Sequence, residues 1–315
     1  MDIGIQGVYP FDMTNLDGST LASPAFRKGS IGLLDKFRIL MSSMTHVEKV
    51  GIYFLIVINV VSIFGYGTFG LHPELVGMYD WIPIVFAFAY PLFAQLQIVA
   101  AFAVFLHSVH RHMSWGWVTL FVATFALSLL SEWAGTTYGV PFGKYEYTHL
   151  LGPKIVDKVP WLIPVSWFFM GLASYGMVVR IQGNKVNSAL FRVTLGSILL
   201  LTWDLTLDPA MSFLTPFWLW ENPGFFYGMP ALNLFGWFVT GLVILSAFEI
   251  LGGQEKVKKL PGNFCFLFYM VNLMLPVGMV VVAGLWWALV VTGVVMTAFF
   301  YLYRALKPGL SAQFE

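Results

Sequence analysis

Three carboxylates lie in or at the ends of long apolar stretches of this chain. Glu132 begins the segment EWAGTTYGVPFGKYEY, and Asp204 and Asp208 lie within WDLTLDPAM. Their spacing of four residues places the two aspartates on one face of a helix. A carboxylate inside an apolar span is costly unless it is paired or faces a cavity, so all three are candidates for a functional site. The plainer alternatives are that Glu132 accepts hydrogen bonds from loop amides and that Asp208 caps the loop after it.

Carboxyl groups in an apolar, aromatic pocket are suited to acid-initiated chemistry on an isoprenoid double bond. Burial favours the protonated form of one acid, while a neighbour that accepts hydrogen bonds stays ionised. Protonation of a trisubstituted alkene leaves a tertiary carbocation, which aromatic π faces stabilise. Capture of that cation by water gives a tertiary alcohol. Loss of a proton gives a ring or a shifted double bond instead.

The composition places these acids in a membrane. The chain has 315 residues, of which 58% are hydrophobic and only 10% are charged, too apolar for a soluble domain. Several apolar runs exceed the roughly 18 residues that mark a spanning helix, and none alternates like a barrel strand. We therefore predict an all-α integral membrane bundle of about eight helices, with about seven to nine as the range. The expected spans are 50–70, 83–107, 116–138, 160–180, 189–208, 229–250, 263–282 and 285–303.

The last two spans require a hairpin near Ala283 and Gly284, because the apolar run 263–303 is too long for one crossing. Pro209 is expected to stop the helix that carries the two aspartates.

The basic residues orient the bundle. Of the 17 Lys and Arg residues, all but Lys144, Lys154 and Lys158 fall on the side that also holds both termini. Cytoplasmic loops are enriched in Lys and Arg, so both termini are predicted to be cytoplasmic. The expected organisation is a partly disordered cytoplasmic tail over 1–48, with an interfacial helix near 31–41, then a catalytic multi-pass domain over 49–304 and a short tail over 305–315.

This orientation gathers the polar residues in the non-cytoplasmic half of the bundle, in a bacterial cytoplasmic or internal membrane. Glu132 lies roughly 25 Å along its helix, and Asp204 and Asp208 lie roughly 18 and 24 Å along theirs. The two longest loops, 139–159 and 209–228, lie outside as well. The cytoplasmic half of the bundle is expected to hold no such group of polar side chains.

Other sites receive little support. The histidines of HSVHRHMSW lie on the cytoplasmic side, remote from the three acids, and are interpreted as an interfacial basic patch rather than metal ligands. The lone Cys265 supports no redox chemistry, and a net charge of +1 gives no indication of nucleic acid. No phosphate-binding or dinucleotide-binding motif is present. We expect no metal and no cofactor. The aromatic residues of FWLWENPGFFYG are interpreted mainly as a membrane-boundary belt.

Four segments together resemble a known family: EWAGTTYGVPFGKYEYTHLLGPK, VPWLIPVSWFFM, WDLTLDPAM and FWLWENPGFFYGMPALNLFGW. They are similar to the membrane family of carotenoid biosynthesis that contains the carotenoid end-group hydratases, γ-carotene hydratase and bisanhydrobacterioruberin hydratase. The resemblance covers roughly residues 50 to 300. It implies a carotenoid 1,2-hydratase that adds water across the terminal double bond of a ψ end group, without a redox cofactor or metal. The lack of an acidic excess favours γ-carotene or lycopene over the haloarchaeal substrate.

Roles within the site follow from the residue types. Glu132 or Asp204 donates the proton, and the other acid, with Asp208, orients the water. Lys144 is a candidate counter-charge for Glu132. The residues expected to bind the substrate are Trp133, Tyr138, Phe142, Tyr145, Trp167, Trp203, Asn233 and Trp237.

Alternatives remain open. A membrane carotenoid cyclase or isomerase needs the same acids and aromatic walls. A proton-coupled transporter of a lipophilic solute can use Glu132 and Asp204 as a proton relay, although transporters place such residues near the midplane of symmetry-related halves. A carotenoid-binding protein without catalysis is a third alternative. The expected partners are a carotenoid in the bilayer, water, membrane lipid and, as a candidate, a downstream carotenoid glycosyltransferase.

Overall fold

The computed structural model describes residues 32–181 and 188–306. Its helices are α1 Leu33–Leu40, α2 His46–Gly65, the π-helix η1 Tyr66–Gly70, α3 Pro73–Val76, α4 Trp81–Met113, the 3-10 turn η2 Ser114–Gly116, α5 Trp117–Tyr138, α6 Leu162–Ile181, α7 Ala189–Asp208, the π-helix η3 Pro209–Phe213, α8 Ala231–Ile250, α9 Gly253–Val257, α10 Phe264–Val282 and α11 Trp286–Leu306. Four short strands complete the described chain: β1 Tyr145–Tyr147, β2 Lys154–Ile155, β3 Val159–Pro160 and β4 Trp218–Trp220.

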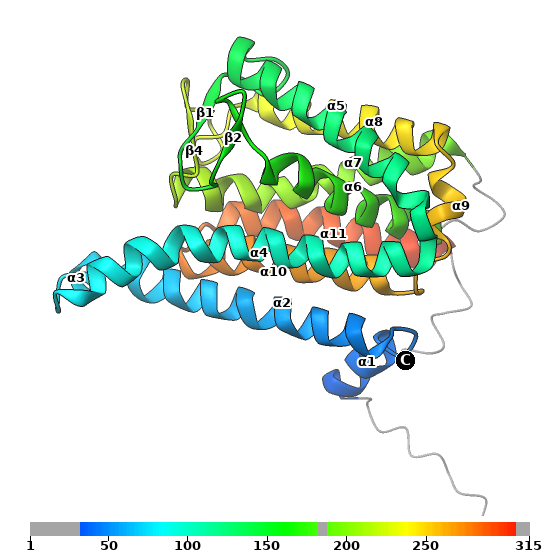
Figure 1. Ribbon diagram of the computed structural model, residues 1–315, viewed down its shortest axis with the longest axis horizontal. Helices are drawn as coiled ribbons and strands as arrows, with labels where there is room; N and C mark the ends of the chain where they lie inside the picture. Colours follow the sequence, from blue (N-terminus) through cyan, green and yellow to red (C-terminus); the bar gives the residue numbers. More distant parts are fainter. Residues whose placement is uncertain (1–31, 182–187, 307–315) are drawn as a thin grey trace, which may run out of the picture.

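Among the described residues, 7 helical segments are long and apolar enough to cross a membrane. The longest, Trp81–Tyr138, has 58 residues and contains two helices, α4 and α5. They are joined at η2, where Ser114 has φ 52°, and the chain reverses there (Figure 1). The prediction of an all-α membrane bundle with about eight helices is confirmed. The side of the membrane on which each end lies stays a prediction.

The helix boundaries match the expected spans closely, with two differences. α4 continues to Met113, beyond the expected end at 107, so the three histidines of the segment HSVHRHMSW all lie in this helix. Pro209 ends α7 as expected, but the chain does not leave the helical path, because Pro209 opens the π-helix η3. The hairpin near Ala283 is confirmed, and Gly284 has φ 71° there.

The ends of the chain are only partly visible. α1 lies within the interval expected for an interfacial helix. Residues 1–31 of the expected N-terminal tail and 307–315 of the C-terminal tail lie outside the described residues.

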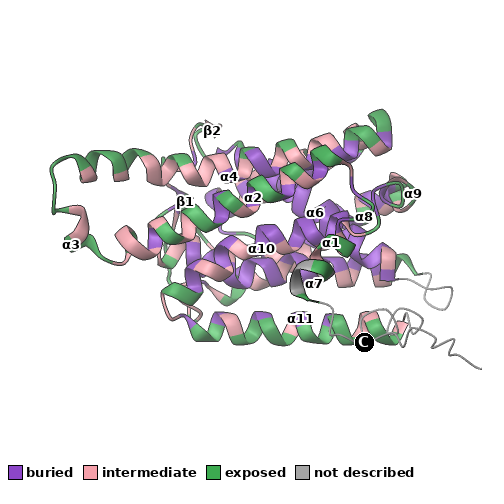
Figure 2. Cartoon of the chain, turned by 90° about the horizontal axis from the view of Figure 1, so that it is seen from below, coloured by how far each residue is buried: buried purple, intermediate pink, exposed green. Residues whose placement is uncertain are grey.

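Helix α6 lies at the centre of the bundle and is buried along nearly its whole length (Figure 2). It packs against α4, α5, α7 and α10, while α7 packs most extensively against α8. A helix that is apolar on every face is stable when other helices surround it. α11, by contrast, presents a largely exposed face (Figure 2). The acids on α5 and α7 are therefore held on either side of a rigid central helix.

The two long loops form small sheets at one end of the bundle (Figure 1). β1 pairs with β4 in antiparallel register, and β2 pairs with β3. β1 and β4 come from different loops, so their pairing ties residues 139–159 to residues 209–228. This sheet lies over the ends of α5 and α7 that carry the three acids.

Candidate active site

Glu132 is buried near the end of α5, with 4% of the residue exposed. The helix ends at Tyr138, and Gly139, with φ 77°, adopts the left-handed conformation that glycine tolerates at this position. The chain then returns over the helix end. A Cβ on Gly135 would lie 2.9 Å from Phe142 Cδ2 and 3.0 Å from Tyr145 Cε1, so the absence of a side chain lets the returning loop approach.

Three donors from the protein surround the Glu132 carboxylate. Oε2 accepts hydrogen bonds from the hydroxyls of Tyr145 and Tyr147, the latter at 2.8 Å. Oε1 accepts one from the indole Nε1 of Trp167 at 2.8 Å. Burial raises the pKa of both tyrosine hydroxyls well above its ordinary value, which keeps them protonated as donors.

Lys144 does not serve as the counter-charge of Glu132. Its Nζ lies 2.9 Å from Glu221 Oε2, and both of these side chains are about half exposed. The strand that begins at Tyr145 directs alternate residues inward, and Lys144 lies just outside it. Neutral hydrogen-bond donors therefore replace the expected ion pair.

The sheet formed by β1 and β4 supplies donors to two acids at once. Tyr145 lies opposite Trp220, and Tyr147 lies opposite Trp218. Successive side chains of a strand point to opposite faces, so Tyr145 and Tyr147 share the buried face while Glu146 is exposed. The ring centroids are 5.0 Å apart in the Tyr145–Trp220 pair and 6.0 Å apart in the Tyr147–Trp218 pair.

Asp204 and Asp208 are buried one turn apart on α7, as their spacing predicts. Asp204 Oδ2 accepts a hydrogen bond from Asn233 Nδ2 at 2.8 Å. Asp208 Oδ1 accepts from the indole N–H groups of Trp218 at 2.7 Å and Trp220 at 3.3 Å. The second oxygen of each aspartate is buried and has no hydrogen-bond partner among the described residues. Each aspartate thus has one oxygen available to a bound molecule.

The aromatic walls include three stacked or edge-to-face tryptophans and a phenylalanine from the loop after α5. Trp167 and Trp237 stack with ring centroids 4.2 Å apart, and Trp203 meets Trp237 edge to face at 5.9 Å. Phe142 is wedged against α8, where a Cβ on Gly236 would lie 2.5 Å from its ring. These rings are held by packing, so their faces have fixed directions.

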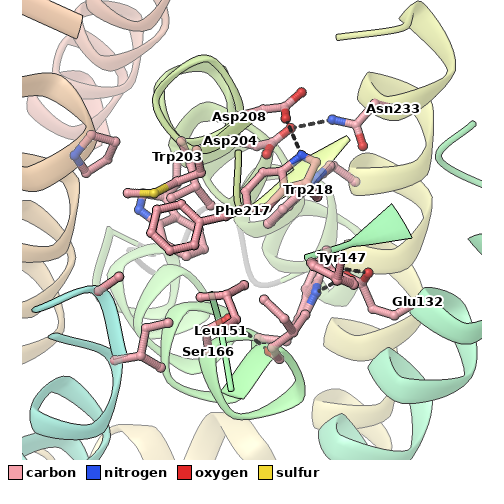
Figure 3. A pocket seen from close by; sticks show the side chains of 18 of the residues that line it. Glu132, Tyr147, Leu151, Ser166, Trp203, Asp204, Asp208, Phe217, Trp218 and Asn233 are labelled. Carbon is pink, nitrogen blue, oxygen red and sulfur yellow. Dashed lines mark hydrogen bonds between the residues drawn. The ribbon is translucent and has the colours of Figure 1, made fainter. Parts of the chain in front are cut away.

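The acids and rings line one cavity of about 90 Å³. Asp204, Asp208 and Asn233 lie together on one side of it, and Glu132 with Tyr147 lies on another (Figure 3). No Lys, Arg or His is among the described residues that line it. Three carboxylates thus face an aromatic cavity without a cation, an arrangement suited to giving up a proton and stabilising a positive charge.

Most of the predicted site residues meet in this cavity. The three acids line it together with Phe142, Tyr145, Trp167, Trp203, Asn233 and Trp237. Trp133 and Tyr138 do not line it: they pack against each other with ring centroids 5.5 Å apart, and Tyr138 is 68% exposed. Their direction on α5 turns them away from Glu132. The roles of all these residues stay predictions.

Sequence reasoning missed several residues of the cavity. Tyr147, Trp218 and Trp220 contact the acids directly. From the sequence alone, the two tryptophans are assigned to a membrane-boundary belt. The alternation in YEY and WLW is the strand signal that could have found them. Gln97 and Asn272 also line the cavity and hydrogen-bond to each other at 3.0 Å. They lie on different helices, α4 and α10, so their pairing gave no pattern to detect in the sequence.

The histidines of α4 lie apart from this site. His110 Nδ1 accepts a hydrogen bond from Trp117 Nε1 at 3.2 Å, and His112 Nε2 lies 3.0 Å from Glu48 Oε1. Among the described residues, no group of three or more His, Cys, Asp or Glu side chains could hold a metal ion.

Comparison with known proteins finds a family model and a curated relative that match part of the chain. A family model described as carotenoid biosynthesis protein matches residues 92–299, more than half of the chain. Bisanhydrobacterioruberin hydratase of Haloarcula japonica is 36% identical over 133 residues, which are 41% of this chain and 44% of that relative. The match therefore spans less than half the length of that curated relative.

No solved structure matches the chain. The matched family region runs from α4 into α11 and contains every acid of the cavity. The chain belongs to the carotenoid biosynthesis protein family.

Proposed function

We propose that the protein is a carotenoid hydratase that adds water across the terminal double bond of a ψ end group, with lycopene or γ-carotene as substrate. The observation that carries the proposal is the aromatic cavity into which three buried carboxylates point without a cation. The relative's name as a hydratase supports water addition, and the family match supports a carotenoid substrate.

The hydrogen bonds divide the acids by role. Glu132 accepts three donors, which stabilise its ionised form and occupy both of its oxygens. Asp204 accepts one donor, from an amide, and its Oδ1 has no partner among the described residues. Asp204 is therefore the proposed proton donor, and Glu132 is the proposed stabiliser of the cation.

Asp208 is the proposed base. Two indole N–H groups hold Oδ1, and Oδ2 is available to accept a hydrogen bond from water. Asp204 protonates the CH carbon of the terminal alkene, which breaks the π bond and leaves a tertiary cation. The water oxygen bonds to that cation and its proton passes to Asp208. Asp204 and Asp208 lie one turn apart on the same face, so the proton can return to Asp204 and complete the cycle.

The aromatic rings complete the proposed mechanism. Trp203 and Trp237 form a perpendicular pair beside the acids, so π faces from two directions border the cavity. Such faces attract a cation electrostatically. The distribution of basic residues supports a location of this cavity in the non-cytoplasmic half of the membrane.

The test is to express the chain in a host that accumulates lycopene or γ-carotene and to analyse the pigments by liquid chromatography with mass detection. Hydration gives a product heavier by one water with the polyene absorption unchanged. An isomer of unchanged mass with altered absorption would favour a cyclase instead. No new pigment from either substrate would contradict the proposal.

A further inference from the structure

A second, larger cavity lies beside the acid cavity, with a volume of about 320 Å³. We call it the apolar groove. It is bordered by α2, η1 and the first half of α4 on one side and by η3 and α10 on the other. Ala94, Met211, Phe217 and Leu275 line both cavities. The two cavities therefore share a wall.

The lining of the groove is almost wholly apolar. No Asp, Glu, Lys, Arg, His, Asn or Gln is among the described residues that line it. The hydroxyl of Ser62 donates to the carbonyl of Ile58 at 2.8 Å, so it is already satisfied within α2. Such a surface suits a hydrocarbon chain and offers little to a polar headgroup or a sugar.

A row of aromatic rings runs along the groove to the shared wall. The ring centroids are 6.2 Å apart between Phe69 and Phe86, 5.7 Å between Phe86 and Tyr90, and 5.4 Å between Tyr90 and Phe217. The last pair is stacked, and Phe217 also lines the acid cavity. The first two pairs are tilted, so the row offers both faces and edges of aromatic rings to the conjugated chain of a polyene.

The outer rim of the groove lies on the exposed surface of the bundle. Val61 on α2 is 44% exposed, and Trp81 and Val85 on α4 are 61% and 52% exposed. α2 and α4 run side by side and extend beyond the other helices toward α3 (Figure 1). From Trp81 to Ala94 the groove follows α4 for roughly 20 Å.

We propose that the apolar groove holds the polyene chain of the substrate and delivers its end group from the bilayer into the acid cavity past Met211 and Phe217. The proposal rests on the proposed function for the nature of the end group. It follows that one end of the carotenoid reacts at a time, while the remainder lies in the groove and in lipid.

Gly65 allows a clean test, because it lines the groove and a Cβ built on it meets no atom within 4 Å. Gly65→Phe therefore adds a ring at the groove without a clash at its Cβ. Gly293→Phe is the matched control: Gly293 lies on the exposed face of α11, and its Cβ also meets nothing within 4 Å. Ala89→Phe fills the groove from α4 and serves as an independent second variant.

The measurement is lycopene binding to the purified protein in lipid nanodiscs, followed by the circular dichroism induced in the visible polyene band. We expect Gly65→Phe and Ala89→Phe to bind lycopene at least about tenfold more weakly than the wild type and Gly293→Phe, as expected for a steric block. Elution as a single species shows that each variant is folded. Wild-type binding in both groove variants would overturn the proposal.

Activity separates this proposal from the proposed function. If the wild type binds lycopene, the groove variants do not, and no water is added, the groove proposal is supported and the proposed hydratase activity is contradicted. If the wild type hydrates lycopene and all three variants do so equally, the proposed hydratase activity is supported and the groove proposal is contradicted.

Discussion

Buried or partly buried carboxylates occur at both ends of the bundle, but their partners differ. At the end near α1 and α9, Glu249 is paired with Arg192: Nε lies 2.5 Å from Oε1, and Nη2 lies 2.7 Å from Oε2. Glu249 also accepts a hydrogen bond from the hydroxyl of Tyr175. Glu48 accepts bonds from Ser108 at 2.6 Å and from the backbone N–H of Thr45. These carboxylates are neutralised or fully hydrogen-bonded.

At the other end, the acids of the cavity have no cationic partner among the described residues, and two aspartate oxygens have no partner of any kind there. A buried carboxylate whose oxygens are paired or hydrogen-bonded is needed by the fold, because removing one partner leaves the other polar group buried and uncompensated. A buried acid with an open oxygen costs stability, so its retention indicates a role with a bound molecule. The comparison thus separates structural acids from candidate catalytic acids.

The expectation that the cytoplasmic half holds no such group of polar side chains was wrong. Glu48 is 1% exposed and Arg192 is 5% exposed, and both lie at that end. From the sequence alone, Arg192 is counted among the basic residues of the cytoplasmic side, and Glu48 is placed in the tail over 1–48. The capping box that Thr45 and Glu48 form at the start of α2 is the local signal that marks Glu48 as structural.

The largest expected effect is that of Asp204→Asn. The amide keeps the shape of the side chain and its contact with Asn233 but cannot donate the proton, so hydration of lycopene falls at least about 100-fold. Product per folded protein is measured by mass detection. Glu221→Gln is the matched control, since Glu221 lies at the same end in an exposed pair with Lys144. Wild-type turnover by Asp204→Asn would show that the donor is misassigned.

Glu132→Gln is expected to abolish turnover as well while the protein stays folded. The variant removes the carboxylate. Its single carbonyl oxygen can accept the hydrogen bond from Trp167, and its NH2 group, in place of Oε2, can donate to a tyrosine hydroxyl. Turnover and the thermal unfolding temperature in detergent are measured together. If both this variant and Asp204→Asn keep full activity, the site is misplaced.

Glu249→Gln should do the opposite, lowering stability rather than turnover. It leaves Arg192 buried without its carboxylate, which costs roughly 3 kcal/mol of unfolding free energy. Replacing both residues, as Arg192→Met with Glu249→Leu, is the control and should recover much of that loss. A drop in turnover per folded molecule would erase the distinction between the two ends.

His110→Ala should have the smallest effect. It removes an exposed hydrogen bond with Trp117, worth at most about 1 kcal/mol, and no contact with the cavity. Hydration of lycopene should stay at the wild-type level in the pigment assay. A large loss of hydration activity would indicate that the histidine segment takes part in the reaction.

Several features could be predicted from local sequence. The apolar runs located the spanning helices, because hydropathy depends on each segment alone. The spacing of Asp204 and Asp208 placed them on one face of α7, and the structure confirms that both line the cavity. The regular rise of a helix likewise placed Glu132 near the end of α5, beside the loop that covers it.

The partners of these acids could not be predicted in the same way. Lys144 is close to Glu132 in sequence, yet it pairs with Glu221, and the donors to Glu132 include Trp167 from another helix. Arg192 and Glu249 are likewise brought together by the packing of α7 on α8. Proximity along the chain says little about which side chains meet across a bundle.

By itself, the sequence determined the membrane bundle, the acids and the aromatic character of their surroundings, since these follow from composition and helical periodicity. Only the tertiary structure decided which acid is held by three donors and which keeps an open oxygen. The physical reason is the pairing of β1 with β4. Its register, set by two loops far apart in the chain, aims Tyr145 and Tyr147 at Glu132 and two tryptophans at Asp208.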